Sequence, residues 1–217
     1  MGLGGWSYLA SMAGIINAVG FLSFQHQGVT HLTGITTQLG ALIAQRQVIQ
    51  AFHLLTVIFS FILGSVFSGF LIQNTTLKLG RRYGVALIVE SVLLLIAIYY
   101  LTHNKLLGTY LASCACGLQN AMASTYSGAV LRTTHVSGLF TDIGILTGQW
   151  LRGLKIDKKR FFLNFILIIS FLIGSILGTV GFNFYSYSTL YIPAFLIGFS
   201  GLAYTASYHC FHLKKNK

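Results

Sequence analysis

Charged residues are scarce in this 217-residue chain, at 8% of the sequence, whereas a soluble domain carries about a quarter. Hydrophobic residues make up 54%, and a single proline is present to interrupt a helix. A chain of this composition lacks the polar surface that a water-soluble fold needs. The scarcity of charge therefore predicts an all-α membrane protein, with residues 1–217 forming a single transmembrane domain.

Acidic residues and cysteines are also few, with three of each. Cys114 and Cys116 are two positions apart, which places them on different sides of a helix and forms no ligand pattern. The H-E-x-x-H, G-x-S-x-G and P-loop motifs are missing. We therefore expect no enzyme activity, no metal site and no cofactor. The net charge of +11 is spread between apolar runs, as in membrane proteins, so we expect no nucleic-acid partner.

Six apolar runs approach the length that crosses a bilayer, about 20 residues for a hydrocarbon layer of about 30 Å. They are residues 6–24, 54–72, 85–101, 106–123, 161–182 and 190–207. Two shorter apolar pieces, residues 35–44 and 139–148, are about half a span long. The chain has eight spans if both short pieces cross and six if neither does.

The distribution of positive residues favours six spans. With six, twelve of the fourteen Lys and Arg residues share one side with both termini. The twelve are Lys78, Arg81, Arg82, Arg132, Arg152, Lys155, Lys158, Lys159, Arg160, Lys214, Lys215 and Lys217, and the other two are Arg46 and Lys105. Eight spans divide them ten to four at best. Because cytoplasmic loops are enriched in Lys and Arg, we expect both termini to be cytoplasmic.

Three pairs of similar phrases indicate an internal duplication. "GIINA" at Gly14 matches "GLQNA" at Gly117, "THLTGITTQLG" at Thr30 matches "THVSGLFTDIG" at Thr134, and "SFILGSV" at Ser60 matches "SFLIGSI" at Ser170. The repeats run from about 5 to 102 and from about 106 to 209. Three spans per half is an odd number, so the second half is inverted. Inverted repeats with broken helices near the midplane are typical of secondary transporters.

Each repeated phrase around Thr30 and Thr134 predicts the start of a short broken or re-entrant helix, with Thr33 and Ser137 as N-caps. Unpaired N–H groups at such a start need protein, water or a ligand when they lie inside a membrane, and they suit an anion. We therefore predict a midplane site, shared by both repeats, for a small solute. The predicted binding residues are Thr33, Gly34, Thr37, Ser137, Gly138, Thr141 and Asp142, with Asn17, His31, Glu90, Asn120, Arg132 and His135 supporting them. The alternative is that these small residues serve helix packing alone.

Two carboxylates lie within apolar sequence. Asp142 occupies the second short piece, where the first repeat has Gln38, and Glu90 lies in a long apolar run. Ionisable residues inside a membrane are costly and often functional. Each could bind a proton or a cation, or pair with Arg132 or a buried histidine.

The phrases "AGIINAVGFLSF", "LTGITTQLG", "GLQNAMAS" and "RTTHVSGLFTDIG" together resemble the YoaK-like family of bacterial membrane proteins. The resemblance covers nearly the whole chain and implies a multi-pass inner-membrane protein with six spans, but no substrate. In one departure, Ile35 stands where the family usually has Asn.

We favour a small secondary transporter or permease, and the alternative is a non-transporting scaffold or sensor. The expected partners are the lipid bilayer and a small solute of unknown identity, for which an anion is one candidate. A homo-oligomer is the alternative to a monomer.

The charge distribution makes a prediction about topology. Reporter domains fused after Arg82 and after Lys217 should both be cytoplasmic, and one fused after Lys105 should be periplasmic, because only this arrangement keeps twelve of the fourteen positive residues inside. Paired alkaline phosphatase and fluorescent protein fusions measure the side directly. Opposite sides for the Arg82 and Lys217 fusions would contradict six spans.

Overall fold

The computed structural model describes residues 3–23, 26, 28–72, 82–127 and 133–215, and every regular element among them is helical. The N-terminal half contains α1 (Leu3–Leu22), α2 (Leu32–Ala44), α3 (Val48–Leu71) and α4 (Arg82–Thr102). The C-terminal half contains α5 (Leu106–Ser127), α6 (Val136–Leu151), α7 (Lys158–Tyr185), a 3-10 helix η1 (Ser186–Leu190) and α8 (Tyr191–Lys215). The predicted all-α class is confirmed.

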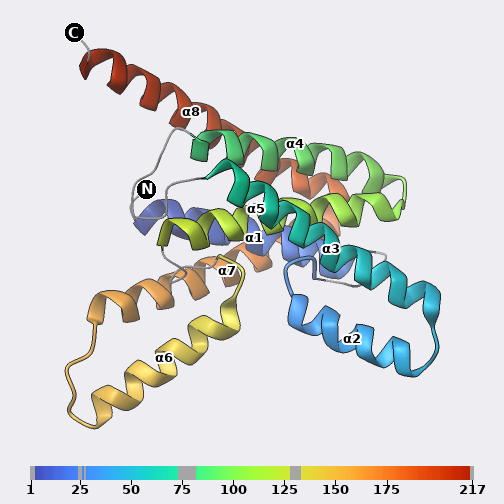
Figure 1. Cartoon of the computed structure of the whole chain (residues 1–217), viewed down its shortest axis with the longest axis horizontal. Coiled ribbons are helices and arrows are strands. Elements are labelled where there is room, and N and C mark those ends of the chain that lie inside the picture. The colour runs from blue at the N-terminus through green and yellow to red at the C-terminus, as the bar shows by residue number, and fades with distance from the viewer. Residues whose placement is uncertain (1–2, 24–25, 27, 73–81, 128–132, 216–217) are drawn as a thin grey trace.

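Four described segments are long and apolar enough to cross a membrane: Gly4–Leu22, Val48–Leu71, Arg82–Thr102 and Lys158–His209. The last of these comprises α7, η1 and most of α8, and α7 begins at the end of the bundle where α8 ends (Figure 1). The chain therefore has the character of a multi-pass membrane protein. Helix α5 is 22 residues long but falls outside this set because Ser, Thr, Gln and Asn lower its hydropathy.

The long helices form a bundle from which α2 and α6 diverge in opposite directions (Figure 1). Helix α1 packs on α7, α3 packs on α5, and α4 packs on both α5 and α8. Helices α2 and α6, which we call the two arms, pack chiefly on α3 and α7 respectively. Each arm begins near the middle of the bundle and runs toward one of its ends, α2 toward one and α6 toward the other.

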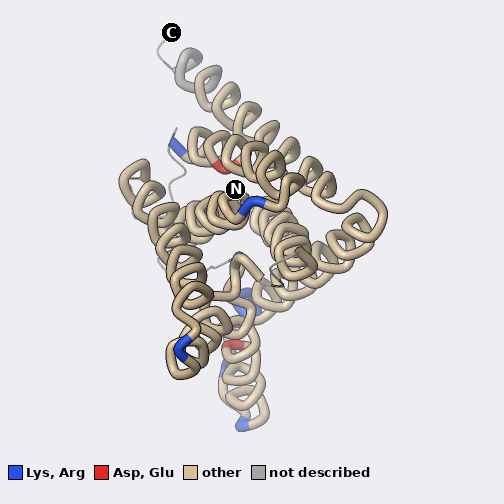
Figure 2. Tube along the Cα trace, turned by 90° about the vertical axis from the view of Figure 1, so that its right-hand side faces the viewer, with Lys and Arg blue, Asp and Glu red and all other residues tan. Residues whose placement is uncertain are grey.

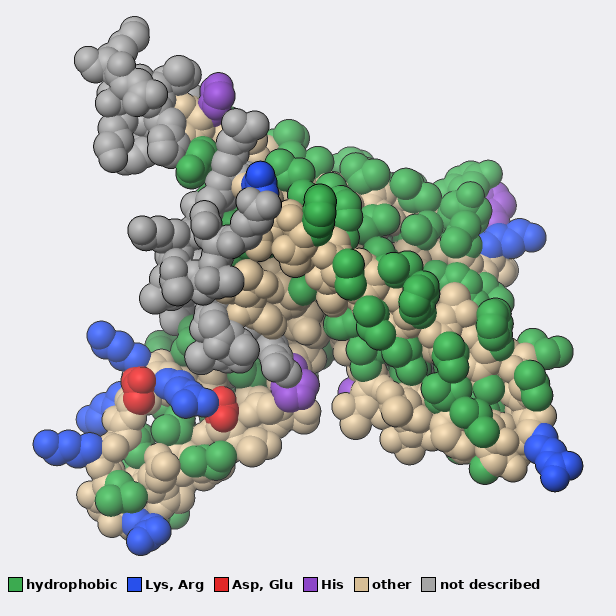
Figure 3. Space-filling model, in the orientation of Figure 1, with side chains coloured by type: hydrophobic (Ala, Val, Ile, Leu, Met, Phe, Trp, Pro, Cys, Tyr) green, Lys and Arg blue, Asp and Glu red, His purple; other side chains and the backbone are tan. Residues whose placement is uncertain are grey.

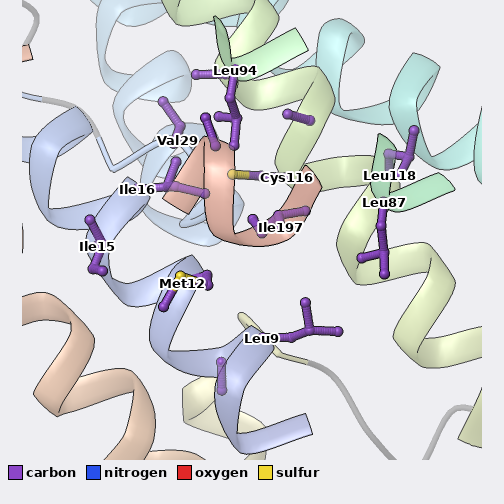
Figure 4. Packing of buried hydrophobic residues seen from close by; sticks show 14 of the residues in the cluster. Leu9, Met12, Ile15, Ile16, Val29, Leu87, Leu94, Cys116, Leu118 and Ile197 are labelled. Carbon is purple, nitrogen blue, oxygen red and sulfur yellow. The ribbon is translucent and has the colours of Figure 1, made fainter. Parts of the chain in front are cut away.

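The main hydrophobic core lies where α1, α4, α5 and α8 meet (Figure 4). Its members include Leu9, Met12, Ile15 and Ile16 of α1, Leu87 and Leu94 of α4, Cys116 and Leu118 of α5, and Ile197 of α8. Large apolar side chains also cover the outside of the molecule (Figure 3), for example Phe52 and Phe70, which are 71% and 80% exposed. Such a surface is stable against lipid and unfavourable against water.

Lys and Arg residues lie at helix ends and in the connections between helices (Figure 2). The connections that hold Arg46 and Lys105 are at one end of the bundle, and the connection from Arg152 to Lys158 is at the other. The apolar middle of the bundle, which would face the hydrocarbon layer, thus carries little exposed charge.

Glycines bring α1 and α7 into backbone contact. A Cβ atom added to Gly14 would collide with the carbonyl oxygen of Phe171. One added to Gly174 would collide with the carbonyl oxygen of Ser11. The hydroxyl of Ser175 donates to the Phe171 carbonyl at 2.9 Å and lies 3.4 Å from the Gly14 carbonyl oxygen. Small residues and bridging hydroxyls of this kind let membrane helices approach closely.

Helices α3 and α5 cross in the same way, with Gly64 in the place of Gly174 and Gly117 in the place of Gly14. A Cβ on Gly64 would collide with the carbonyl oxygen of Cys114, and one on Gly117 with that of Phe61. The hydroxyl of Ser65 donates to the carbonyl of Gly117 at 3.1 Å. Both repeated phrases around these glycines therefore serve helix crossing.

The arms end in similar turns. Arg46 follows α2 with a φ of 59°, and Gly153 follows α6 with a φ of 76°. The N–H of Gln47 donates to the carbonyl of Leu42 at 2.9 Å, which is the longer bond of a Schellman turn. A comparable bond follows α6. These turns reverse the chain so that each arm folds back on the next helix.

The crossings predict a contrast between two glycines of α3. Gly64→Val should destabilise the protein by about 3 kcal/mol or more, because its side chain meets backbone that cannot move aside. Gly69→Val is the matched control, since nothing lies within 4 Å of the added Cβ. Thermal unfolding in detergent should show a lower midpoint for the Gly64 variant only. Equal midpoints would refute the close crossing.

Candidate functional site

Both arms begin at a histidine. His31 is the N-cap of α2 with φ −97° and ψ 64°, and His135 is the N-cap of α6 with φ −94° and ψ 61°. Neither side chain makes a capping hydrogen bond. The prediction that Thr33 and Ser137 are the N-caps is wrong, because each lies inside the first turn. The two helix starts are therefore alike in backbone and uncapped by their own side chains.

The imidazole rings of these N-caps lie over the first turn of each arm. A Cβ on Gly34 would be 2.7 Å from Nδ1 of His31. On Gly138 it would collide with Nδ1 of His135. The predicted position of both glycines at the start of a short helix is correct, since each is the third residue. Their role is to leave room for the ring.

A cavity of about 470 Å³ lies between the two arm starts. Its lining consists of six pairs of residues that match in the repeat: Asn17 and Asn120, Thr30 and Thr134, His31 and His135, Leu32 and Val136, Thr33 and Ser137, and Phe61 and Phe171. Both repeated phrases thus face one space. Figure 3 shows the molecule indented between the arms, with histidine side chains beside the indentation. His31, Thr33, His135 and Ser137 are all exposed there.

The two asparagines differ in their hydrogen bonds. Oδ1 of Asn17 accepts from the hydroxyl of Thr30 at 2.7 Å and from its N–H at 3.2 Å, which ties α1 to the chain before α2. Oδ1 of Asn120 is buried and has no hydrogen-bond partner among the described residues. In that half, the neighbouring Gln119 accepts from the hydroxyl of Thr133 at 3.3 Å. The first half is braced through its asparagine and the second through the adjacent glutamine.

The structure does not place all predicted site residues at the cavity. The hydroxyls of Thr37 and Thr141 donate to the carbonyls of Thr33 and Ser137, both at 3.0 Å, one turn further along each arm. They are exposed and do not belong to the lining. Arg132 lies outside the described residues.

Asp142 also lies outside the lining and joins α6 to α7. Its Oδ2 is 3.0 Å from Nη2 of Arg160 and accepts from Nδ2 of Asn164 at 3.5 Å. The side chains of Arg160 and Asp142 are 45% and 27% exposed. The ion-pair partners expected for Asp142 were Arg132 or a buried histidine, whereas its partner in the structure is Arg160. The role of Asp142 in binding a proton or a cation stays a prediction.

Glu90 is fully buried in α4 and is likewise absent from the cavity lining. Neither carboxylate oxygen has a hydrogen-bond partner among the described residues. A buried carboxyl group without hydrogen-bond partners is costly.

Six lining positions were absent from the predicted site: Thr30, Leu32, Phe61, Thr134, Val136 and Phe171. A signal for each existed in the sequence, because all six belong to repeated phrases. Within the described part of the chain, no group of three His, Cys, Asp or Glu side chains is placed to hold a metal ion.

Most of the chain matches one known protein family. Residues 6–203 match the profile of a family described as protein of unknown function, DUF1275. The chain belongs to the DUF1275 family. No curated protein and no solved structure matches it significantly. Within this DUF1275 protein, Ile35 packs on Leu54 and Val57 of α3, so the departure noted at this position lies at the contact between arm and bundle.

The pair of Asp142 and Arg160 can be tested by removing either charge. Asp142→Asn and Arg160→Gln should both unfold within about 1 kcal/mol of wild type, because a partly exposed pair contributes little. If the pair only joins α6 to α7, the solute flux that each variant supports in proteoliposomes should equal that of the other variant. A large loss of flux confined to Asp142→Asn would show that the carboxylate itself takes part in binding.

Proposed function

We propose that this DUF1275 protein is a small secondary transporter or permease, and that the cavity between the arm starts is its solute site. The observation that carries the proposal is the lining of the cavity by six repeat-matched pairs of residues. A cavity of about 470 Å³ whose lining combines apolar side chains with histidines, asparagines and hydroxyl groups has the size and make-up of a small-molecule site. A scaffold or sensor, the alternative, would need no such space at this position. We propose no catalytic role.

The architecture proposed with it is six spans, as two inverted repeats with one arm each. Its support is that the packing partners exchange when the halves are exchanged: α1 on α7 becomes α5 on α3, and the contact of α2 with α3 becomes that of α6 with α7. The arms run toward opposite ends of the bundle, as inversion requires. Membership of the YoaK-like branch of the family is part of this proposal.

The proposed orientation places both termini in the cytoplasm of a bacterium. Its support is that α1 begins and α8 ends at the same end of the bundle (Figure 1). The positive residues from Arg152 to Arg160 lie at that end, and Arg46 and Lys105 lie at the other. Lys and Arg are enriched on the cytoplasmic side of membrane proteins.

The site proposal predicts the effect of filling the space under the histidine rings. Gly34→Leu and Gly138→Leu should lower solute flux at least about tenfold, because the new side chain displaces a ring that lines the cavity. Flux of small solutes into proteoliposomes, followed by light scattering, measures the loss.

Each variant has a matched control on the same arm. Gly40 and Gly144 are exposed, and nothing lies within 4 Å of a Cβ added to either. Gly40→Leu and Gly144→Leu should retain wild-type flux, and all four proteins should unfold at similar temperatures. Equal flux for Gly34→Leu and Gly40→Leu would show that the solute does not pass through the cavity.

A further inference from the structure

We infer that the solute recognised by this cavity is a small anion. The inference rests on the proposed function, which assigns the cavity as a solute site. It adds the charge and the size of the solute, which follow from the groups around the cavity.

The first source of selectivity is the pair of arm starts. Helices α2 and α6 are 13 and 16 residues long, and their first residues line the cavity from two sides. Each helix N-terminus carries about half a positive charge. Because neither start is capped by the side chain at its N-cap, the first N–H groups have no side-chain acceptor from that residue. Two positive ends on one cavity attract an anion and repel a cation.

The side chains of the lining supply further donors. His31 and His135 can each donate from the imidazole, and the hydroxyls of Thr33 and Ser137 stand two residues further along the arms. Carboxylates are missing from the lining, since Asp142 is paired with Arg160 and Glu90 is buried elsewhere. A cation would therefore meet donors and positive dipoles without a counter-charge.

Asn120 gives an independent indication that a ligand is expected. The matching residue, Asn17, accepts a hydrogen bond from Thr30. The buried Oδ1 of Asn120 has no hydrogen-bond partner among the described residues. A buried polar atom of this kind is costly unless something bonds it. The amide of Asn120 has both donor and acceptor atoms and borders the cavity. Because Oδ1 is an acceptor, the anion cannot bond it directly, and a water molecule bound with the anion would supply the donor that Thr30 supplies in the other half.

The volume limits the size of the anion. About 470 Å³, in a cavity whose lining includes Phe61 and Phe171, accommodates an inorganic anion with water or an organic acid anion and is too small for a whole membrane lipid.

The experiment measures flux in proteoliposomes containing the full chain at pH 8. Potassium salts of nitrate, chloride, phosphate and oxalate are compared with urea, glycerol and tetramethylammonium gluconate, with valinomycin present to balance charge. At least one of the four anions should enter about tenfold faster than in protein-free liposomes, and the neutral solutes and the cation should not.

The double variant His31→Gln/His135→Gln connects the flux to the cavity. It should lower anion flux about tenfold or more, since each imidazole contributes one charge-assisted donor. His103→Gln is the control, because His103 follows α4 at an exposed site and is absent from the lining. Should the double variant not fold, Thr33→Val and Ser137→Ala remove a lining hydroxyl each and are expected to lower anion flux in the same direction.

The outcomes separate this inference from the proposed function. Anion flux that falls in the cavity variants and not in His103→Gln supports both. Entry of urea, glycerol or tetramethylammonium without any of the four anions overturns the anion and leaves a permease. Anion flux unchanged in every cavity variant overturns the assignment of anions to this cavity. No flux of any solute overturns the permease and the anion together.

Discussion

Backbone-to-backbone contact at two glycine crossings determines where the candidate site can form. Gly14 allows α1 to touch the carbonyl of Phe171, and Gly117 allows α5 to touch the carbonyl of Phe61. Both phenylalanines line the cavity. Asn17 and Asn120 stand three residues beyond these glycines, about one helical turn away. A larger side chain at either crossing would separate the helices and, with them, the walls of the cavity.

The arms depend on the same crossings but are held in different ways. Ile35 attaches α2 to α3 through a small apolar cluster with Leu54 and Val57. Helix α6 is attached to α7 by the ion pair of Asp142 and Arg160 as well. Apolar contact inside a bilayer is weakly directional because lipid tails are equally apolar, whereas an ion pair fixes two atoms. The halves therefore share a geometry and differ in the kind of contact that joins each arm to the bundle.

Much of the site could be predicted from the sequence because the similar phrases mark matching residues by position. The paired histidines, the paired glycines at helix starts and the shared location of the two phrases were all available from the repeat. The N-caps were not, because Thr33 and Ser137 have high capping propensity and the chain instead enters each helix two residues earlier, at a histidine. Propensity describes helix ends in water, where no ring has to lie on the first turn.

The remaining differences have similar physical causes. Arg160 could not be paired with Asp142 from the repeat, because it lies beside the charged insertion that shifts the register from 104 to 110 positions. Helix α5 has lower hydropathy than a typical span since its polar residues are internal: Ser113 donates to the carbonyl of Val57, and Gln119 is 1% exposed. A hydropathy scale counts such residues as if they faced lipid.

The cavity lies between two groups of helices, and each group mixes the halves of the chain. One contains α1, α7 and the arm α6, and the other contains α3, α5 and the arm α2. Direct contact between the groups is confined mainly to a slight one between α1 and α5, with α4 and α8 alongside. Asn17 and Phe171 belong to the first group, and Asn120 and Phe61 to the second. In the proposed permease, a small rotation of one group against the other would open the cavity toward one end of the bundle and close it toward the other. The tight glycine crossings within each group would then keep its own wall intact during that movement.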